Sequence, residues 1–254
     1  MDKIPKCQIP KQVRNDSRVF AFTLAEVLIT LVIIGVIAAL TIPNLLQKYQ
    51  EQTTVKKVQK FYSNLSNAYS LAIKDNGPAN EWGMAGDWST QDTEKIYEIL
   101  FKPYFKIAKN CGAYNSGQCI TNANYKTLNN LDANSTVSTY GTNRGYYKIA
   151  LDDGAAVWWR GDSNTPINAA IFYDVNGKKE PNQWGKDLFA FAIKNDKVFP
   201  HGIQSGTYSQ YPFNSNCQKT NQGYGCAAWV VYKGNMDYLH CDGLTWNSRS
   251  CKDK

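Results

Sequence analysis

Residues 22–43 constrain this chain more than any other stretch, because they read FTLAEVLITLVIIGVIAALTIP and carry one formal charge, that of Glu26. As an α-helix, the 21 residues before Pro43 would be about 31 Å long. That length matches the hydrocarbon core of a bilayer, which is about 30 Å thick. Within the run, only Gly35 strongly weakens helix formation. We therefore predict a membrane-spanning helix.

The charges on either side of this run predict its orientation. Residues 1–21 hold five Lys or Arg residues against two Asp residues, a net charge of +3, and the remaining 233 residues carry +4. Positive charge beside a membrane helix favours the cytoplasmic side, so we expect a cytoplasmic N-terminus and an exported C-terminal region. A charge of +4 over so long a region is too dilute to predict nucleic-acid binding. The alternative is an ordinary secretory signal peptide, but no Ala-x-Ala site closely follows the apolar run.

Cysteine usage agrees with export. The chain has seven cysteines, of which Cys7 lies in the basic leader. The even set that remains favours disulfides in an exported region. No pair of cysteines, or of Cys and His, has the spacing of zinc ligands. The easiest pair to predict is Cys111–Cys119, whereas the last four cysteines allow three connectivities. The disulfide candidates are Cys111, Cys119, Cys217, Cys226, Cys241 and Cys251.

The pattern changes beyond Pro43 from apolar to amphipathic. Apolar side chains recur at steps of three and four positions, which is typical of a helix with one buried face. We predict one helix of about 50 residues that is kinked, or loses a hydrogen bond, at Pro43 and ends at the Asp75-Asn76-Gly77-Pro78 sequence. The residues of the buried stripe are Val55, Val58, Tyr62, Leu65, Tyr69 and Ala72.

The second half of the chain predicts antiparallel strands. Residues 145–151 and 155–160 flank the turn Asp152-Asp153-Gly154 and indicate a hairpin. Residues 167–173 and 188–194 indicate two more strands, and the latter turns into 197–199. A short second helix is expected from near Asp92, followed by an irregular stretch from Cys111 to about residue 143. Residues 226–239 fit either a strand or a short helix. The fold class is therefore α+β.

The N-terminal motif resembles a known family. Residues 21–26, AFTLAE, followed by an apolar run and Pro43, resemble the signature of type IV pilins and type II secretion pseudopilins. The resemblance implies that a prepilin peptidase cuts the Ala21–Phe22 bond and methylates the new amino terminus of Phe22. It also implies that Glu26 is a buried acid used in assembly and that Pro43 is the helix-kinking proline. Where this sequence has Ala21, the family usually has Gly.

The same resemblance implies an organisation for the whole chain. Residues 1–21 would be a basic cytoplasmic leader, 22–43 the transmembrane and assembly helix, and 44–254 an exported globular domain that includes an amphipathic helix half at 44–75. The implied pilin-like fold packs a long N-terminal helix on an antiparallel sheet with a disulfide-stabilised C-terminal region. The implied location is the bacterial inner membrane, crossed once, and then a periplasmic or surface filament.

The chemistry of Glu26 favours the same interpretation. A carboxylate four residues into a membrane helix costs roughly 2.5–3.5 kcal/mol to insert. Cleavage before Phe22 would create an amine in the same apolar layer, on the same or a neighbouring subunit. Pairing with that amine would favour assembly, because an unpaired buried charge is far worse than a paired one. The alternative is a Glu26 side chain that reaches the membrane interface.

One loop has the composition of a calcium site. Asp174, Asn176 and Asp187 lie between two predicted strands, near Gly177, and hard oxygen ligands of this kind suit Ca²⁺. Lys178 and Lys179 oppose a cation there, and a structural turn is the alternative. The run 174–189 also resembles the C-terminal regions of secretion-type pseudopilins. No cofactor beyond this Ca²⁺ hypothesis is expected.

The sequence thus predicts a structural subunit rather than an enzyme. Neither a Gly-x-Ser-x-Gly, nor a His-Glu-x-x-His, nor a phosphate-binding motif is present, and there are two histidines, His201 and His240. The expected partners are the prepilin peptidase, other pilin or pseudopilin subunits and an inner-membrane assembly platform. The alternatives are a pilin-anchored adhesin or receptor that binds glycan or DNA through its many aromatic residues, and a membrane-anchored enzyme.

Overall fold

A computed structural model describes residues 23–84, 90–113, 119–121, 124–133, 145–161, 169–194, 197–204 and 211–252. The chain divides into two compact units, residues 1–47 and residues 48–254. The first described element, helix α1 (Leu24–Asn76), begins in the first unit and ends in the second.

Helix α1 changes character along its length. The large apolar side chains of residues 24–46 are exposed, for example Leu40 at 70%. This helix is long and apolar enough to cross a membrane. From Val55 onward, one face of the helix is buried. The helix ends as predicted at Asn76, because Gly77 adopts a positive φ of 73° and its N–H bonds to the carbonyl of Ile73.

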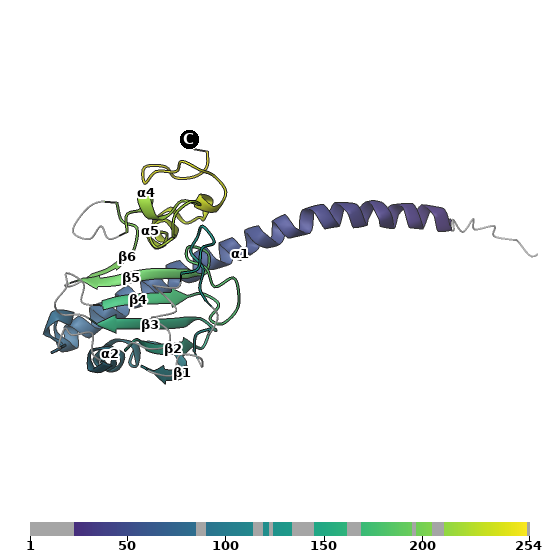
Figure 1. Ribbon diagram of the computed structural model, residues 1–254. Helices are drawn as coiled ribbons and strands as arrows, with labels where there is room; N and C mark the ends of the chain where they lie inside the picture. Colours follow the sequence, from purple (N-terminus) through teal and green to yellow (C-terminus); the bar gives the residue numbers. More distant parts are fainter. Residues whose placement is uncertain are drawn as a thin grey trace, which may run out of the picture. The chain divides into compact units, whose positions relative to one another are not determined.

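The second unit contains a six-stranded sheet in which each strand pairs antiparallel with the next strand along the chain. Figure 1 shows these strands side by side in chain order. The strands are β1 (Ile107–Gly112), β2 (Tyr147–Leu151), β3 (Ala156–Gly161), β4 (Ala169–Asp174), β5 (Leu188–Lys194) and β6 (Lys197–Pro200).

Short helical segments surround the sheet. Helix α2 (Thr90–Ile96) runs into a π-helical turn, η2 (Tyr97–Phe101). The other segments are η1 (Ala79–Glu81), α4 (Phe213–Asn216), α5 (Ala227–Lys233) and η4 (Asp237–Leu239).

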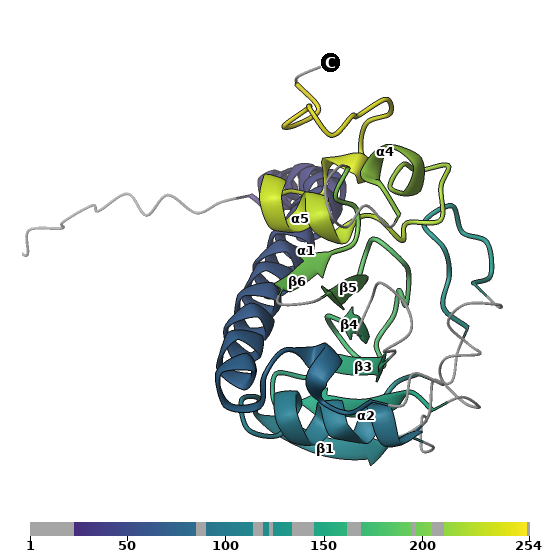
Figure 2. The ribbon, with the colours of Figure 1, turned by 90° about the vertical axis from the view of Figure 1, so that its left-hand side faces the viewer.

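Each face of the sheet carries its own apolar layer. On one face, the buried stripe of α1 packs against alternate strand residues, and the ring of Phe61 stacks on Tyr173 with centroids 4.0 Å apart. On the other face, Trp158 and Phe172 pack against Tyr125 and Trp184 from the loops. Figure 2 shows α1 along one side of the strands and the loops along the other. The alternation of side chains in a strand places these two sets on opposite faces.

The structure confirms the α+β class, the hairpin and the strands predicted after it, corrects two details and settles one alternative. Residues 107–112 form strand β1, although the sequence predicted that the irregular stretch begins at Cys111. The centre of the α1 stripe is Phe61, which is buried, rather than Tyr62, which is half-buried. For residues 226–239, where the sequence fitted either a strand or a short helix, the structure shows helix α5 and the 3-10 turn η4.

Candidate functional site

The first described residues form a capping box at the start of α1. Thr23 Oγ1 accepts the backbone N–H of Glu26 at 3.2 Å. In return, Glu26 Oε2 accepts the backbone N–H of Thr23 at 2.9 Å and its hydroxyl at 2.8 Å. This reciprocal pairing is the Ser/Thr-x-x-Glu device that closes a helix N-terminus, so the helix begins at Leu24. The predicted processing residues Ala21 and Phe22 lie outside the described residues.

The predicted assembly residues both lie in α1. Within a single chain the side chain of Glu26 is exposed, and the hydroxyl and N–H of Thr23 hold its carboxylate at the start of the helix. Pro43 lies inside the helix, which continues without a break to Asn76. Since proline has no N–H, the carbonyl of Ala39 loses its usual helical donor at this point.

The loop between β4 and β5 brings together the residues of the calcium hypothesis. Asp174 ends β4 on the same face as Phe172, and its Oδ1 accepts the N–H groups of Asn176 and Gly177 at 3.1 and 2.9 Å. Its Oδ2 accepts the hydroxyl of Tyr125 at 2.6 Å. Asp187, just before β5, accepts the N–H groups of Asn182 and Gln183 at 2.8 and 2.6 Å. Both carboxyl groups therefore organise the turn.

Burial sets the acid–base properties of these two groups. Asp174 and Asp187 are buried, with exposures of 0% and 3%. Burial raises the pKa of Asp174 well above its usual range, and the nearby charge of Asp187 raises it further. Burial also raises the pKa of Asp187 to about 6, against the lowering effect of its backbone N–H donors. The pair thus tends to hold a proton at mildly acidic pH.

The fit of this loop to Ca²⁺ is incomplete. Calcium takes six to eight oxygen ligands, whereas the carboxylate oxygens of Asp174 and Asp187 already accept protein N–H and O–H groups. The side-chain oxygens of Asn176 and Asn182 are buried without a hydrogen-bond partner among the described residues. No group of three or more His, Cys, Asp or Glu side chains arranged for a metal occurs in the described part of the chain. The geometry is that of a structural turn, and calcium binding stays a prediction.

The six predicted cysteines form three disulfides between neighbours in the sequence. The pairs are Cys111–Cys119, Cys217–Cys226 and Cys241–Cys251. The first pair is the one predicted from spacing. The structure also selects one of the three connectivities that the sequence left open for the other four cysteines.

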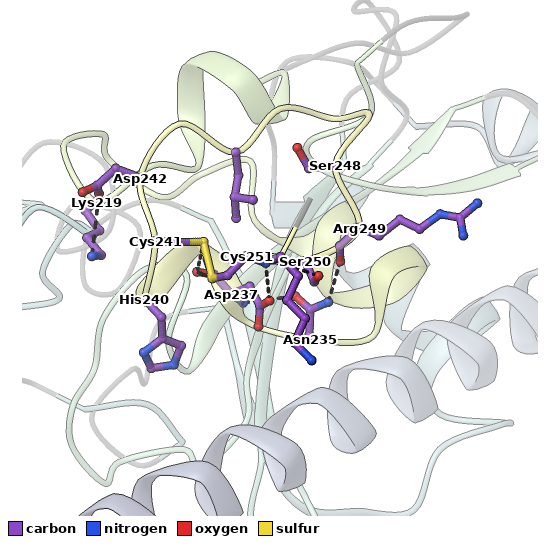
Figure 3. Close-up of a disulfide and its surroundings, with 12 residues drawn as sticks. Lys219, Asn235, Asp237, His240, Cys241, Asp242, Ser248, Arg249, Ser250 and Cys251 are labelled. Atoms are coloured by element: carbon purple, nitrogen blue, oxygen red, sulfur yellow. Dashed lines mark hydrogen bonds and ion pairs between the residues drawn. A yellow bond between two sulfur atoms is a disulfide. The ribbon is translucent and has the colours of Figure 1, made fainter. Parts of the chain in front are cut away.

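The last of these disulfides belongs to a C-terminal clamp, which we define as residues 235–251 with Glu51. In Figure 3, Asp237 lies beside the Cys241–Cys251 bond, and its Oδ2 accepts the N–H of Cys251 at 2.7 Å. Asn235 donates to the carbonyl of Arg249 at 2.9 Å. His240 Nε2 lies 2.8 Å from Glu51 Oε2, which ties the clamp to α1. The sequence did not predict this contact between His240 and Glu51, because 189 positions separate the two residues.

A buried lysine was also missed by sequence reasoning. Lys148 in β2 is fully buried, and its Nζ donates to the carbonyls of Ala113 and Tyr146 at 2.8 and 2.7 Å. Burial lowers its pKa to about 8. An alternating strand pattern predicts which face a lysine occupies, but it gives no sign that a loop will cover it.

Most of the described tryptophans are part of the core. Trp82, Trp158, Trp159, Trp184 and Trp229 are buried. Because these five side chains are buried, they are not part of an exposed sugar-binding surface. Of the two histidines, His201 is fully buried, and burial lowers its pKa to about 3, so its ring stays neutral.

Comparison with known proteins identifies one family. Residues 44–241 match the model of a family of unknown function, DUF6613. No curated protein and no solved structure matches the chain. The matched region begins directly after Pro43 and includes all six strands of the sheet.

Proposed function

The chain belongs to this family of unknown function, DUF6613, and from that premise we propose that it is a structural subunit of a type IV pilus or a type II secretion pseudopilus. A prepilin peptidase removes residues 1–21, and the mature chain then polymerises through the first part of α1. The proposal places the subunit in the bacterial inner membrane before assembly. Its second unit, residues 48–254, is then the exported head. In this proposal, the packing of the long helix on the antiparallel sheet is a pilin-like fold.

The observation that carries this proposal is the double character of α1. A single helix of 53 residues presents exposed apolar side chains over residues 24–46 and then buries one face of its second half on the head. In water, such an exposed apolar stretch would be strongly unfavourable, since each buried Leu or Ile side chain contributes about 1.5–3 kcal/mol. A bilayer, or the apolar helices of other subunits, would remove that cost.

Glu26 gives the helix a reason to associate. Its carboxylate lies within the apolar stretch and has hydrogen bonds only to Thr23 among the described residues. Hydrogen bonds from a neutral hydroxyl and amide do not neutralise a charge in a medium of low dielectric constant. The amine that cleavage would create at Phe22 can do so, on the same or an adjacent subunit. Assembly would then place each acid beside an amine.

The first test examines processing. The full chain is produced in a bacterium with an active prepilin peptidase, and the mature N-terminus is determined by mass spectrometry. We expect it to begin at Phe22, with an added methyl group on the amine. A strain without the peptidase is the control and should yield the chain with its leader. Retention of residues 1–21 in the peptidase-positive strain would contradict the proposal.

The second test examines assembly. We expect Glu26→Ala to leave membrane insertion and processing unchanged and to reduce filaments at least ten-fold, measured by shearing and electron microscopy. The matched control is Thr41→Ala, which removes another polar side chain from α1, one whose hydroxyl bonds to the Ile37 carbonyl of its own helix. Normal filaments from the Glu26→Ala chain would rule out this role for the acid.

A further inference from the structure

A groove with a volume of about 740 Å³ lies between the part of α1 that starts at Lys48 and the turn after α5. This volume is within the usual range of small-ligand sites, roughly 300–1,000 Å³. Its lining has four lysines, Lys48, Lys56, Lys57 and Lys60, against two carboxylates, Glu51 and Asp237, which leaves two positive charges in excess.

The charged side chains that line the groove differ in whether they already have partners within the protein. Glu51 pairs with His240, and Asp237 accepts the N–H of Cys251, so both carboxylates serve the C-terminal clamp. Lys57 donates to the carbonyl of Val175 at 3.1 Å. The other three lysines, Lys48, Lys56 and Lys60, are exposed and form no ion pair with any described residue. We call these three the groove lysines.

The position of the groove lysines along α1 indicates where an anionic partner would come from. Lys48 follows the last exposed leucine of the apolar stretch, Leu46, by two positions. At 1.5 Å per residue, the Cα atoms of Lys48, Lys56 and Lys60 lie about 3, 15 and 21 Å beyond that leucine along the helix. Each headgroup layer of a bilayer is roughly 5–8 Å deep, and the field of an anionic leaflet decays over a further ~8 Å.

The direction of the side chains brings the ammonium groups closer. In an α-helix, long side chains point back toward the N-terminus, which in α1 is the direction of the apolar stretch. Lys48 therefore falls within the headgroup layer of a bilayer that holds residues 24–46, Lys56 within its field, and Lys60 at the limit of its field.

We propose that the groove lysines hold the subunit against anionic phospholipids while it is in the membrane: Lys48 binds their phosphate-bearing headgroups, and Lys56 and, more weakly, Lys60 are attracted by the field of the leaflet. The inference rests on the membrane-inserted state in the proposed function, and it adds a lipid partner for the polar half of α1. The interaction retains the subunit at the leaflet until it leaves for the filament. It weakens in steps from Lys48 to Lys60, because the distance from the headgroups increases.

The test uses the full chain in nanodiscs. One set contains phosphatidylcholine alone, and the other contains phosphatidylcholine with roughly 30% phosphatidylglycerol, a fraction that produces a negative surface potential. Limiting acetylation followed by mass spectrometry measures the accessibility of each lysine. We expect acetylation of Lys48 and Lys56 to slow at least three-fold in the anionic discs, and that of Lys60 to slow less. Lys109 in β1 and Lys197 in β6, which are exposed, should react equally in both.

A pair of matched variants separates a lipid site from general charge. Lys48→Gln, Lys56→Gln and Lys60→Gln together should abolish the preference for phosphatidylglycerol over phosphatidylcholine among lipids that remain bound in native mass spectrometry. The control combines Lys109→Gln, Lys197→Gln and Lys252→Gln, which removes the same charge from exposed positions, and it should keep the preference.

Several results would overturn the inference. Equal acetylation in the two kinds of disc would exclude a lipid partner. Equal protection by inorganic phosphate or glycerol phosphate in neutral discs would show a site for free anions, and protection only in discs that hold two chains would show an interface between copies. None of these results concerns filament assembly, so the proposed function would stand. A chain that does not enter discs at all would instead contradict the membrane anchor.

Discussion

The buried carboxyl groups of Asp174 and Asp187 show what the sequence reveals about a single residue and what it conceals. The spacing of polar residues between two strands predicted that the residues of this loop would act together. The hydroxyl of Tyr125, which donates to Asp174, could not be predicted, because it comes from a loop 49 positions away in the sequence. The proton affinity of the pair depends on that long-range burial.

This pair makes stability depend on pH in an unusual direction. Burial raises the pKa of Asp187 to about 6 and that of Asp174 above its usual range. Between about pH 4 and pH 6 the folded chain therefore holds protons that the unfolded chain releases. The free energy of unfolding should be highest at the acidic end and fall as the pH rises, by on the order of 1–3 kcal/mol.

Chemical denaturation of the detergent-solubilised chain at several pH values measures this slope. Asp187→Asn should reduce it, because the amide does not titrate, while burial still raises the pKa of Asp174. Asp152→Asn, in the exposed β2–β3 turn, should leave it unchanged. A free energy of unfolding that rises from pH 4 to pH 6 would contradict the assignment.

Gly202 is a residue whose lack of a side chain is required by packing. It has a φ of 113°, and a Cβ atom there would collide with the carbonyl oxygen of Gly225. Gly202→Ala should lower the free energy of unfolding by on the order of 3 kcal/mol or more. Gly154→Ala is the matched control, since Gly154 also has a positive φ, of 85°, but open space around its Cα. It should cost only about 1 kcal/mol. Equal losses in the two variants, measured by denaturation, would show that backbone conformation alone explains both.

At the scale of elements, α1 and β1 show what the apolar pattern of the sequence could not predict. The helical period in α1 predicted its buried face, but Phe61 and Tyr62 are 100° apart on the helix and both border that face. Only the sheet decides between them, because Phe61 stacks on Tyr173. Strand β1 has mostly exposed side chains and two irregularities in its register with β2. It shows little of the apolar alternation that identifies a half-buried strand.

Phe61 should therefore be a large contributor to the contact between α1 and the sheet. Its ring lies against Tyr173, Phe105 and Phe191 and is 3% exposed. Phe61→Ala should lower the free energy of unfolding by about 3–5 kcal/mol, because it leaves a cavity. Asn64→Ala, on the exposed side of the same helix, should change it by less than about 0.5 kcal/mol. A loss below about 1 kcal/mol for Phe61→Ala would show that the helix–sheet contact does not depend on this ring.

At the scale of the whole molecule, the disulfides are the feature of the structure that bears on the predicted export. Cysteine parity and the apolar N-terminal run predicted oxidation in an exported region, and the structure has three bridges in the second unit. Each closes a loop of 8 to 10 residues, which in the chain-entropy account stabilises the fold by about 2–3 kcal/mol. The pairing of the last four cysteines needed the structure, because spacing alone does not rank the alternatives.

The disulfide pattern can be checked on the full chain, isolated without reduction. Peptide mapping without reduction should recover Cys217 linked to Cys226 and Cys241 linked to Cys251, and reduction should lower the free energy of unfolding by several kcal/mol. Cross-linked peptides that join Cys217 to Cys241 would contradict the pairing, and unchanged stability after reduction would remove its energetic role.

The order of the strands has a consequence for translocation. Since each strand of the sheet pairs with the one just before it in the chain, every new segment that emerges after the N-terminal helix finds its partner already in place. Closing loops between sequence neighbours costs little entropy and is fast. In the proposed orientation the N-terminus stays in the cytoplasm and the chain beyond α1 emerges in sequence order, so the head could fold progressively from β1 toward the C-terminal clamp, without waiting for its last residue.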